Sequence, residues 1–283
     1  MPGMDSQPCP VPRRVGVVHK RTSPEAAETA RNVERFLRAK GLDVLSDERE
    51  LARDADLMVV LGGDGTLIHA ARLLDGRRAP ILGINMGSLG FMTEIPQSEL
   101  YPMLDRVLAG EATLTERMKF RVHLHRAGEG PAPALDAEVL NDVVIAKNAL
   151  SRMTELDTRC SGRYVATYKA DGIIVATPTG STAYSLAANG PIVFPTMRAV
   201  IISPICPHTL TQRPLVVPDD QDINIILMND TEVYLTLDGQ AGLPISRGDR
   251  VQVKQSTNRV LLVQNPKIDF FGILRTKLRW GER

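Results

Sequence analysis

One strand-to-helix turn limits the possible folds of this chain more than any other feature. The apolar run Leu57-Met58-Val59-Val60-Leu61 leads directly into Gly62-Gly63-Asp64-Gly65, and helical spacing follows over 66–74. A short apolar run bounded by glycine is typical of a buried strand. Strands that alternate with helices form mainly parallel sheets. We therefore expect this turn to belong to an α/β domain.

The same alternation extends over roughly the first 112 residues. Apolar runs at 15–19, 42–45 and 80–85 predict three further strands. Helices are predicted over 24–40 and near 97–109. The first of these helices opens with Thr22-Ser23-Pro24-Glu25, which places a capping side chain before a proline and an acidic residue in the first turn.

The pattern changes near residue 113, where short alternating strands begin and helix signals almost vanish. The predicted strands are 121–125, 137–140, 163–169, 172–176, 223–227, 233–237, 250–254 and 260–263. We therefore expect an α/β N-terminal domain with a mainly parallel sheet over 14–115 and a β-rich C-terminal domain over 116–265. The first domain would bind nucleotide and the second substrate, and the helical segment 266–283 would pack back on the first domain.

Composition narrows the possible functions. Lys and Arg (34) nearly balance Asp and Glu (33), so no electrostatic footprint for nucleic acid is evident. No apolar run approaches the roughly 20 residues of a membrane helix, and residues 1–14 lack the apolar region of a signal peptide. The three cysteines are widely spaced, which argues against a disulfide framework or a zinc site. We expect a cytoplasmic protein that binds neither nucleic acid nor membrane.

The glycine turn has the residues of a phosphate-binding site, except that it also contains a carboxylate, Asp64. Glycines at the start of a helix let backbone N–H groups approach a phosphate. A carboxylate repels phosphate, so Asp64 would instead take a proton or hold a cation. The alternative is an ordinary turn, but these residues directly after an apolar strand favour the functional interpretation. His69 could reach a phosphate or simply lie on a solvated helix surface.

Three further polar clusters lie beside apolar runs: Asn141-Asp142, Asp238-Gly239-Gln240, and Lys169-Ala170-Asp171-Gly172, which leads to the hydroxyl-rich segment 177–185. Asp-Gly is also a hairpin signal, and Ser and Thr also gather at helix caps. For the hydroxyl-rich segment, a nucleoside-binding and a structural interpretation are evenly balanced. Because the Walker, dinucleotide and protein-kinase motifs are absent, phosphate charge would most simply be neutralised by Mg²⁺ carried with the nucleotide.

With these four clusters in this order, the chain resembles the bacterial NAD kinase family over about residues 15–271. Diacylglycerol-type lipid kinases and 6-phosphofructokinases share the GGDG turn, whereas the three later clusters are more specific. The resemblance implies Mg²⁺-dependent transfer of the γ-phosphate of ATP, or of phosphate from polyphosphate, to the 2′-hydroxyl of the adenosine ribose of NAD, which gives NADP. It also implies a homodimer or homotetramer. The alternatives are a lipid or sugar kinase and an NAD(P)-binding module without turnover.

The resemblance also implies roles for particular residues. Asp64 would be the catalytic base, Gly65 part of the phosphate-side turn, and His69 a basic neighbour of the phosphates. Asn141 and Asp142 would hold the substrate nucleotide, with Asp142 one methylene shorter than the more usual Glu. The other implied nucleotide-binding residues are Arg152, Lys169 and Asp171, with contributions across a subunit interface, Thr182, Ala183, Tyr184, Ser185, Leu186 and Ala187 along the adenosine pocket, and Gln240, which would close it. No residue is assigned as a metal ligand.

Overall fold

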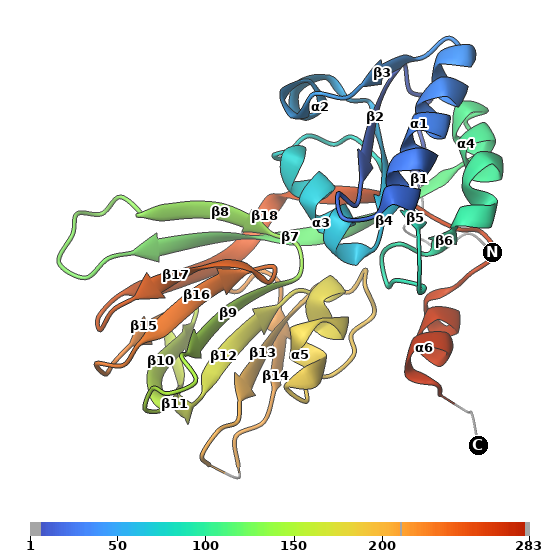
Figure 1. Cartoon of the computed structure of the whole chain (residues 1–283). Coiled ribbons are helices and arrows are strands. Elements are labelled where there is room, and N and C mark those ends of the chain that lie inside the picture. Colours follow the sequence, from blue (N-terminus) through green and yellow to red (C-terminus); the bar gives the residue numbers. More distant parts are fainter. Residues whose placement is uncertain (1–6, 210, 281–283) are drawn as a thin grey trace. The chain divides into compact units, whose positions relative to one another are not determined.

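The chain forms two compact units in a computed structural model that describes residues 7–209 and 211–280 (Figure 1). The first unit comprises Met1–Arg117 and Asn258–Arg283, and the second comprises Met118–Thr257. Strands β7 (Thr113–His125) and β18 (Arg250–Val263) each begin in one unit and end in the other. The return of the chain to the first unit therefore begins inside β18, at residue 258.

The first unit contains the mainly parallel sheet expected from the sequence. Its strands follow the order β18-β5-β4-β2-β3, and every neighbouring pair in this series is parallel. The bounds of the elements not yet given are β1 Gln7–Pro8, β2 Arg14–His19, β3 Asp43–Leu45, β4 Leu57–Gly62, β5 Ile81–Asn85, β6 Ile95–Pro96, α1 Pro24–Ala39, α2 Glu48–Asp54, α3 Asp64–Leu73, η1 Gln97–Glu99, α4 Leu100–Leu108 and α6 Phe270–Leu278.

Local sequence explains most of these helices. Ser23 caps α1 by accepting a hydrogen bond from the backbone N–H of Ala26 (3.2 Å), and Pro24 is the first helical residue, as predicted. Helix α2 was not predicted, because Leu51 is its only buried residue and so gives no periodic signal. The side chain of Asp47 caps α2 instead, by accepting from two backbone N–H groups.

The second unit is β-rich, as expected, and its strands pair antiparallel. One sheet follows the order β14-β13-β12-β9-β16-β17, and the other series runs β11-β10-β15-β18. The remaining bounds are β8 Leu135–Val139, β9 Asp142–Lys147, β10 Thr154–Cys160, β11 Arg163–Ala170, β12 Gly172–Ala176, η2 Thr179–Thr182, α5 Tyr184–Ala187, β13 Ala199–Ile205, β14 Leu215–Pro218, β15 Ile223–Leu227, β16 Val233–Leu237 and β17 Gln240–Ile245. One apolar core takes side chains from both series, and a smaller cluster packs on β9, β12 and β13.

The sequence patterns missed or divided several strands of this unit. Strands β10, β13, β14 and β17 were not predicted, and the strands expected at 250–254 and 260–263 form the single strand β18. Two short helical elements, η2 and α5, follow β12, where the only helix signal of this half was expected.

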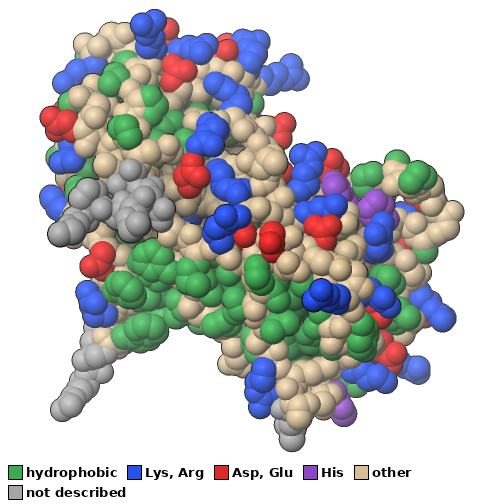
Figure 2. All heavy atoms as spheres, turned by 180° about the vertical axis from the view of Figure 1, so that it is seen from behind, with side chains coloured by type: hydrophobic (Ala, Val, Ile, Leu, Met, Phe, Trp, Pro, Cys, Tyr) green, Lys and Arg blue, Asp and Glu red, His purple; other side chains and the backbone are tan. Residues whose placement is uncertain are grey.

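The surface carries charges of both signs. On the face shown in Figure 2, Lys and Arg side chains are interspersed with Asp and Glu side chains, and hydrophobic side chains gather in the lower part of the view. Within residues 7–209 and 211–280, no helix combines the length and the apolar character needed to cross a membrane.

Candidate active site

The glycine turn lies at the carboxyl end of β4, beside the carboxyl end of β5. Gly62 is the last residue of β4 and pairs in parallel register with Asn85, the last residue of β5. Gly63 is the N-cap of α3 and Asp64 its first residue. Because parallel neighbours end at the same edge, the loop 86–93 that follows β5 lies against the turn, and the N–H of Met86 donates to the carbonyl of Gly62 (3.2 Å).

This loop holds the Asp64 carboxylate through four hydrogen bonds. Oδ1 accepts from the backbone N–H groups of Met92 (3.1 Å) and Thr93 (3.0 Å) and from the Thr93 hydroxyl (3.0 Å). Oδ2 accepts from the N–H of Phe91 (2.9 Å). We call loop 86–93 the cradle. A carboxylate offers about two acceptor positions on each oxygen, so Oδ2 can still accept one more hydrogen bond.

The glycines around Asp64 have different physical reasons to be glycine. A Cβ on Gly90 would lie 2.3 Å from Oδ1 of Asp64, and one on Gly62 would lie 2.4 Å from Oγ1 of Thr66, so both positions are crowded. A Cβ on Gly63 or Gly65 would meet no atom of the described residues within 4 Å, and neither glycine has a positive φ. The space beside these two backbone positions is therefore open to a ligand.

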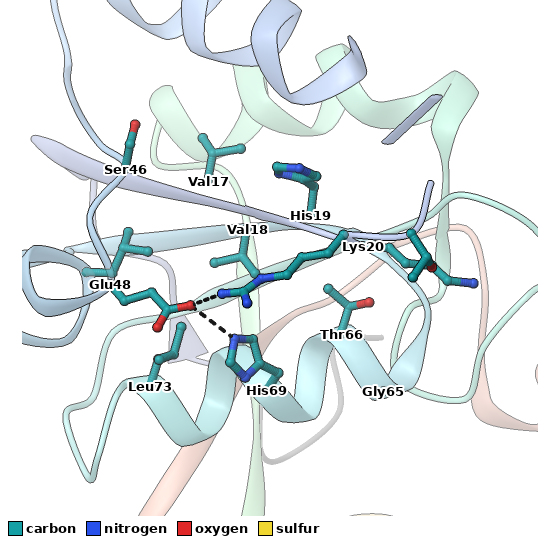
Figure 3. A pocket seen from close by; sticks show the side chains of 13 residues that line it. Val17, Val18, His19, Lys20, Ser46, Glu48, Gly65, Thr66, His69 and Leu73 are labelled. Carbon is teal, nitrogen blue, oxygen red and sulfur yellow. Dashed lines mark hydrogen bonds and ion pairs between the residues drawn. The ribbon is translucent and has the colours of Figure 1, made fainter. Parts of the chain in front are cut away.

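A pocket of about 420 Å³ adjoins this turn and is lined by three segments of the first unit. Gly65, Thr66 and His69 come from α3, and Lys20, Arg21 and Thr22 follow β2, as Figure 3 shows for several of them.

Glu48, at the start of α2, contacts two of these side chains. It makes an ion pair with Arg21, and its Oε1 lies 3.8 Å from Nε2 of His69. Val18, Leu51 and Leu73 add an apolar part to the lining.

A second group of predicted residues meets in the second unit. Asp238 and Gly239 have φ values of 50° and 68° and form the hairpin turn between β16 and β17, as their sequence indicated. The Asp238 carboxylate also accepts from the backbone N–H groups of Leu140 (3.0 Å), Asn141 (2.6 Å) and Asp142 (3.3 Å). Two clusters far apart in the sequence therefore form one structural group.

Asp142 is almost completely buried, with 3% of its surface exposed. Burial and then the neighbouring charge of Asp238 raise the pKa of Asp142 to about 7, although a hydrogen bond from the backbone N–H of Tyr184 favours the ionised form. The charge of this group therefore changes near neutral pH.

Two polar atoms of this group are buried without a hydrogen-bond partner in the described part of the chain. Among the described residues, Oδ1 of Asn141 and Oγ1 of Thr179 have no hydrogen-bond partner. Leaving such an atom unsatisfied costs about 1–3 kcal/mol, and a bound nucleotide can offer the missing partners. Thr179 lies close to Asn141, because the next residue, Gly180, packs directly against Asn141. A Cβ on Gly180 would lie 2.0 Å from the carbonyl oxygen of Asn141.

Several hydroxyls of the 177–185 segment have structural roles instead. The Thr177 hydroxyl donates to the carbonyl of Leu140 (2.6 Å), and the Ser181 hydroxyl donates to the carbonyl of Pro178 (2.6 Å). Ser185 is completely buried, and its hydroxyl lies 3.1 Å from that of Ser203. For these three side chains, the structural interpretation describes the observed contacts, whereas Tyr184 is 46% exposed.

The other predicted residues lie elsewhere on the same unit. Gln240 begins β17, next to the Asp238 turn. Asp171 pairs with Lys147 (3.6 Å) and Lys169 with Glu155 (3.0 Å), while Arg152 lies in the loop between β9 and β10.

In β9, Lys147 is five residues from Asp142, or about 17 Å along an extended strand. Within one chain, the structure therefore does not bring Arg152, Lys169 and Asp171 to the Asp142 group.

Sequence reasoning missed two parts of the first unit. Lys20, Arg21 and Glu48 line the pocket, yet the loop after β2 and the start of α2, from which they come, carry no recognisable motif. The cradle could have been found, because Met86-Gly87-Ser88-Leu89-Gly90 follows an apolar strand in the same manner as the GGDG turn.

An oriented carboxylate at a glycine-lined helix start, next to a polar pocket at the carboxyl ends of parallel strands, defines a class: enzymes that transfer phosphoryl groups and bind nucleotides. Comparison with models of known protein families identifies the family within that class, because two such models match this chain. The ATP-NAD kinase N-terminal domain matches residues 46–112, and the ATP-NAD kinase C-terminal domain matches residues 140–265. The chain belongs to the NAD kinase family, and it is a phosphotransferase that phosphorylates NAD.

Individual relatives agree with this assignment over nearly the whole chain. It is 47% identical to an NAD kinase of Geotalea daltonii over 96% of this chain and 100% of that one, and 50% identical to an NAD kinase of Citrifermentans bemidjiense over 91% and 89%. Among solved structures, it resembles yeast NADH kinase complexed with NADH (TM-score 0.91, 25% identity, 98% and 89% covered). It also resembles an NAD kinase from Archaeoglobus fulgidus in complex with ATP (TM-score 0.76, 26% identity, 93% and 99% covered).

Proposed function

We propose that Asp64 is the proton acceptor when the γ-phosphate of ATP is transferred to the 2′-hydroxyl of the adenosine ribose of NAD. The observation that carries this proposal is the orientation of its carboxylate: four donors fix the group and leave one acceptor position, on Oδ2. A group with this geometry is suited to receive one proton from one hydroxyl.

This reaction does not need a strong base as the proton acceptor. Phosphoryl transfer proceeds through a loose transition state, so alignment and charge neutralisation lower most of the barrier. The ribose oxygen forms a bond to the γ-phosphorus, the bond to the oxygen that bridges to the β-phosphate breaks, ADP leaves, and the hydroxyl proton passes to Oδ2 of Asp64. The open backbone at Gly63 and Gly65 lets the N–H groups at the start of α3 approach the phosphates.

We also propose that a divalent cation accompanies the nucleotide. No group of three or more His, Cys, Asp or Glu side chains in the described part of the chain could hold a metal ion. A Mg²⁺ ion keeps several water ligands and binds substrate phosphates, so it can arrive with the nucleotide and needs no dedicated protein cage. When bound, such an ion would neutralise charge on the transferred phosphate.

For the phosphoryl donor, we propose the pocket beside α3. Its cationic groups, Lys20 and Arg21, and the imidazole N–H of His69 suit a phosphate chain, and its apolar part, with Leu51 and Leu73, suits a purine base. That combination favours a nucleoside triphosphate over bare polyphosphate, which has no apolar part.

For NAD, we propose the Asn141–Asp142–Asp238 group of the second unit, which also carries the unpartnered polar atoms of Asn141 and Thr179. Thr182, Ala183, Tyr184, Leu186, Ala187 and Gln240 remain proposed contacts; the observed hydroxyl contact of Ser185 supports a structural role for it instead.

Assembly of several copies would explain Arg152, Lys169 and Asp171. Because these residues lie a strand length from the Asp142 group of their own chain, we propose that they serve the site of a partner subunit in a homodimer or homotetramer. Exposed apolar side chains on the edge strand β14, Leu215 (38%) and Val216 (43%), offer surface for such an assembly. Light scattering of the purified protein measures the number of copies. The cytoplasmic location stays a prediction.

Substitution of the base tests the central proposal. General-base catalysis typically contributes about 10²–10⁴-fold, so Asp64→Asn should lower kcat by about that factor while NAD binding, measured by calorimetry, persists. Near-normal turnover in Asp64→Asn would refute the assignment. Formation of NADP or NADPH from NAD or NADH, with ATP or polyphosphate as donor, measures both specificities, and phosphorylation of a lipid or sugar in place of NAD would support the alternative kinase.

A further inference from the structure

The cradle is tied to a distant segment of the chain within the first unit. Strand β18 runs parallel to β5, with Leu262 opposite Ile81. Both strands therefore end at the same edge of the sheet, and the residues that follow β18 reach the loop that follows β5. That loop is the cradle of Asp64.

Glu94 makes the connection, and it directly follows Thr93, which holds Oδ1 of Asp64 by two hydrogen bonds. Oε1 of Glu94 accepts from the backbone N–H of Asn265 (2.8 Å). The Asn265 side chain is 3% exposed, and its Nδ2 lies 3.5 Å from the carbonyl oxygen of Glu94 and 3.5 Å from Oε2 of Glu99. Lys267 also pairs with Glu99 (2.9 Å).

The charges around Glu94 favour a fixed position for it. Burial raises the pKa of Glu94, while the Asn265 N–H and the charge of Arg117 act in the opposite direction. Arg117 is 9% exposed and donates to Oγ1 of Thr115 (2.7 Å). A carboxylate in such surroundings depends on its few donors, so Glu94 has little freedom to turn away from Asn265.

The same C-terminal segment also lies near a residue of the cradle, Phe91. Nζ of Lys277, in α6, lies 5.7 Å from the ring centre of Phe91. The N–H of Phe91 donates to Oδ2 of Asp64, the oxygen with the open acceptor position. The C-terminal segment therefore contacts the chain on both sides of Met92, at Phe91 and at Glu94.

We infer that Glu94 is a positioning residue, which transmits the anchoring of the C-terminal segment at Asn265 to the cradle and so fixes the direction of the Asp64 carboxylate. The inference rests on the proposed role of Asp64. Glu94 touches neither substrate nor the reacting atoms in this scheme; it acts only through the loop that orients the base.

Two substitutions of Glu94 separate positioning from stability. Glu94→Gln keeps an oxygen that can accept from Asn265 but removes the charge that faces Arg117, whereas Glu94→Ala removes both. We expect both variants to melt at lower temperature. We expect kcat to fall about 10-fold or more in Glu94→Ala and to stay within about twofold of the parent in Glu94→Gln, with KM for NAD and for ATP changed by less than about twofold in each.

A double-mutant cycle with Asp64→Asn gives the decisive measurement. If Glu94 acts through Asp64, Glu94→Ala lowers kcat no further once Asp64 is replaced by Asn. Multiplicative losses, an unchanged kcat in Glu94→Ala, or equal kcat losses in Glu94→Ala and Glu94→Gln would overturn the inference. Near-normal turnover of Asp64→Asn alone would instead overturn the proposed function, so the two failures are distinguishable.

A control variant and a second variant complete the test. Gln264→Ala removes the hydrogen bond from the Thr113 hydroxyl (3.2 Å), in the same segment but not toward the cradle, and should leave kcat unchanged. If Glu94→Ala does not fold, Glu94→Asp takes its place in the cycle, because the shorter side chain loses the contact with the backbone N–H of Asn265, which Asn265→Ala would keep. We expect Glu94→Asp to lower kcat about threefold or more, again only when Asp64 is present, and an undiminished kcat in this variant would overturn the inference.

Discussion

Replacing Asp142 by Asn should stabilise the protein, and by more at high pH than at low pH. Burial and the charge of Asp238 raise the pKa of Asp142 from 3.8 to about 7. Each factor of ten in proton affinity corresponds to about 1.4 kcal/mol. Ionising this side chain in the folded protein therefore costs about 4 kcal/mol at pH 8, a cost that the uncharged amide in Asp142→Asn does not carry.

The sign follows from proton linkage. Between pH 4 and pH 7 the folded state holds a proton on Asp142 that the unfolded state has released, so the free energy of unfolding falls as the pH rises. The contribution of the protonated carboxyl is complete below about pH 4 and is lost as the pH passes about 7. From about pH 5 to pH 8 this single group should lower the free energy of unfolding by about 2.5 kcal/mol, and Asp142→Asn should remove that decrease.

Urea unfolding of both proteins at about pH 5, 6, 7 and 8 measures the difference directly. Asp249→Asn is a matched control of opposite sign: burial raises the pKa of Asp249, but hydrogen bonds from Ser246, Ala127 and Arg126 outweigh that effect and lower it overall. At high pH, Asp249→Asn should therefore destabilise the protein. A gain in Asp142→Asn that is the same at both ends of this pH range would refute the reasoning, because the gain would then not arise from ionisation.

Two further predictions concern the first unit. Gly90→Ala should lower kcat about 10-fold or more without unfolding the protein, because the new Cβ would lie 2.2 Å from Oγ1 of Thr93 and 2.3 Å from Oδ1 of Asp64 and so displace the cradle; steady-state kinetics with a melting curve check this, and an unchanged kcat would contradict it. Arg21→Ala should raise KM for ATP about fivefold, since an exposed ion pair is worth about 1 kcal/mol, and leave KM for NAD unchanged; equal changes in both constants would count against the donor pocket.

The sequence predicted those elements of the fold that depend only on residues close together in the chain. The apolar run before Gly62, the cap at Ser23 and the Asp238-Gly239 turn each produced the expected element, because each depends on neighbouring residues only. Helix α2 and strand β10 were missed, because their exposed faces are polar and the period is weak over seven residues. The meeting of Asp238 with the backbone of Asn141 depends on the pairing of β16 with β9, which no local pattern shows.

The site shows the same division between local and distant information. Asp64 was recognisable from its own turn, whereas Arg21, Glu48 and His69 meet in one pocket only because the ends of β2, β3 and β4 meet at one edge of the sheet. Hydroxyl content alone was a poor guide, since Thr177, Ser181 and Ser185 bond to other parts of the protein.

The discontinuous first unit also sets an order of events during synthesis. A ribosome completes the second unit, Met118–Thr257, before it reaches the residues from 258 onward that the first unit requires. Domains generally fold as they emerge, but the first unit must wait for its strand β18, and Glu94 must wait for Asn265. A nascent chain stalled before residue 258 would thus carry every residue of the GGDG turn and the cradle without the anchor that holds them, so the geometry of the proposed base is among the last features of the molecule to form.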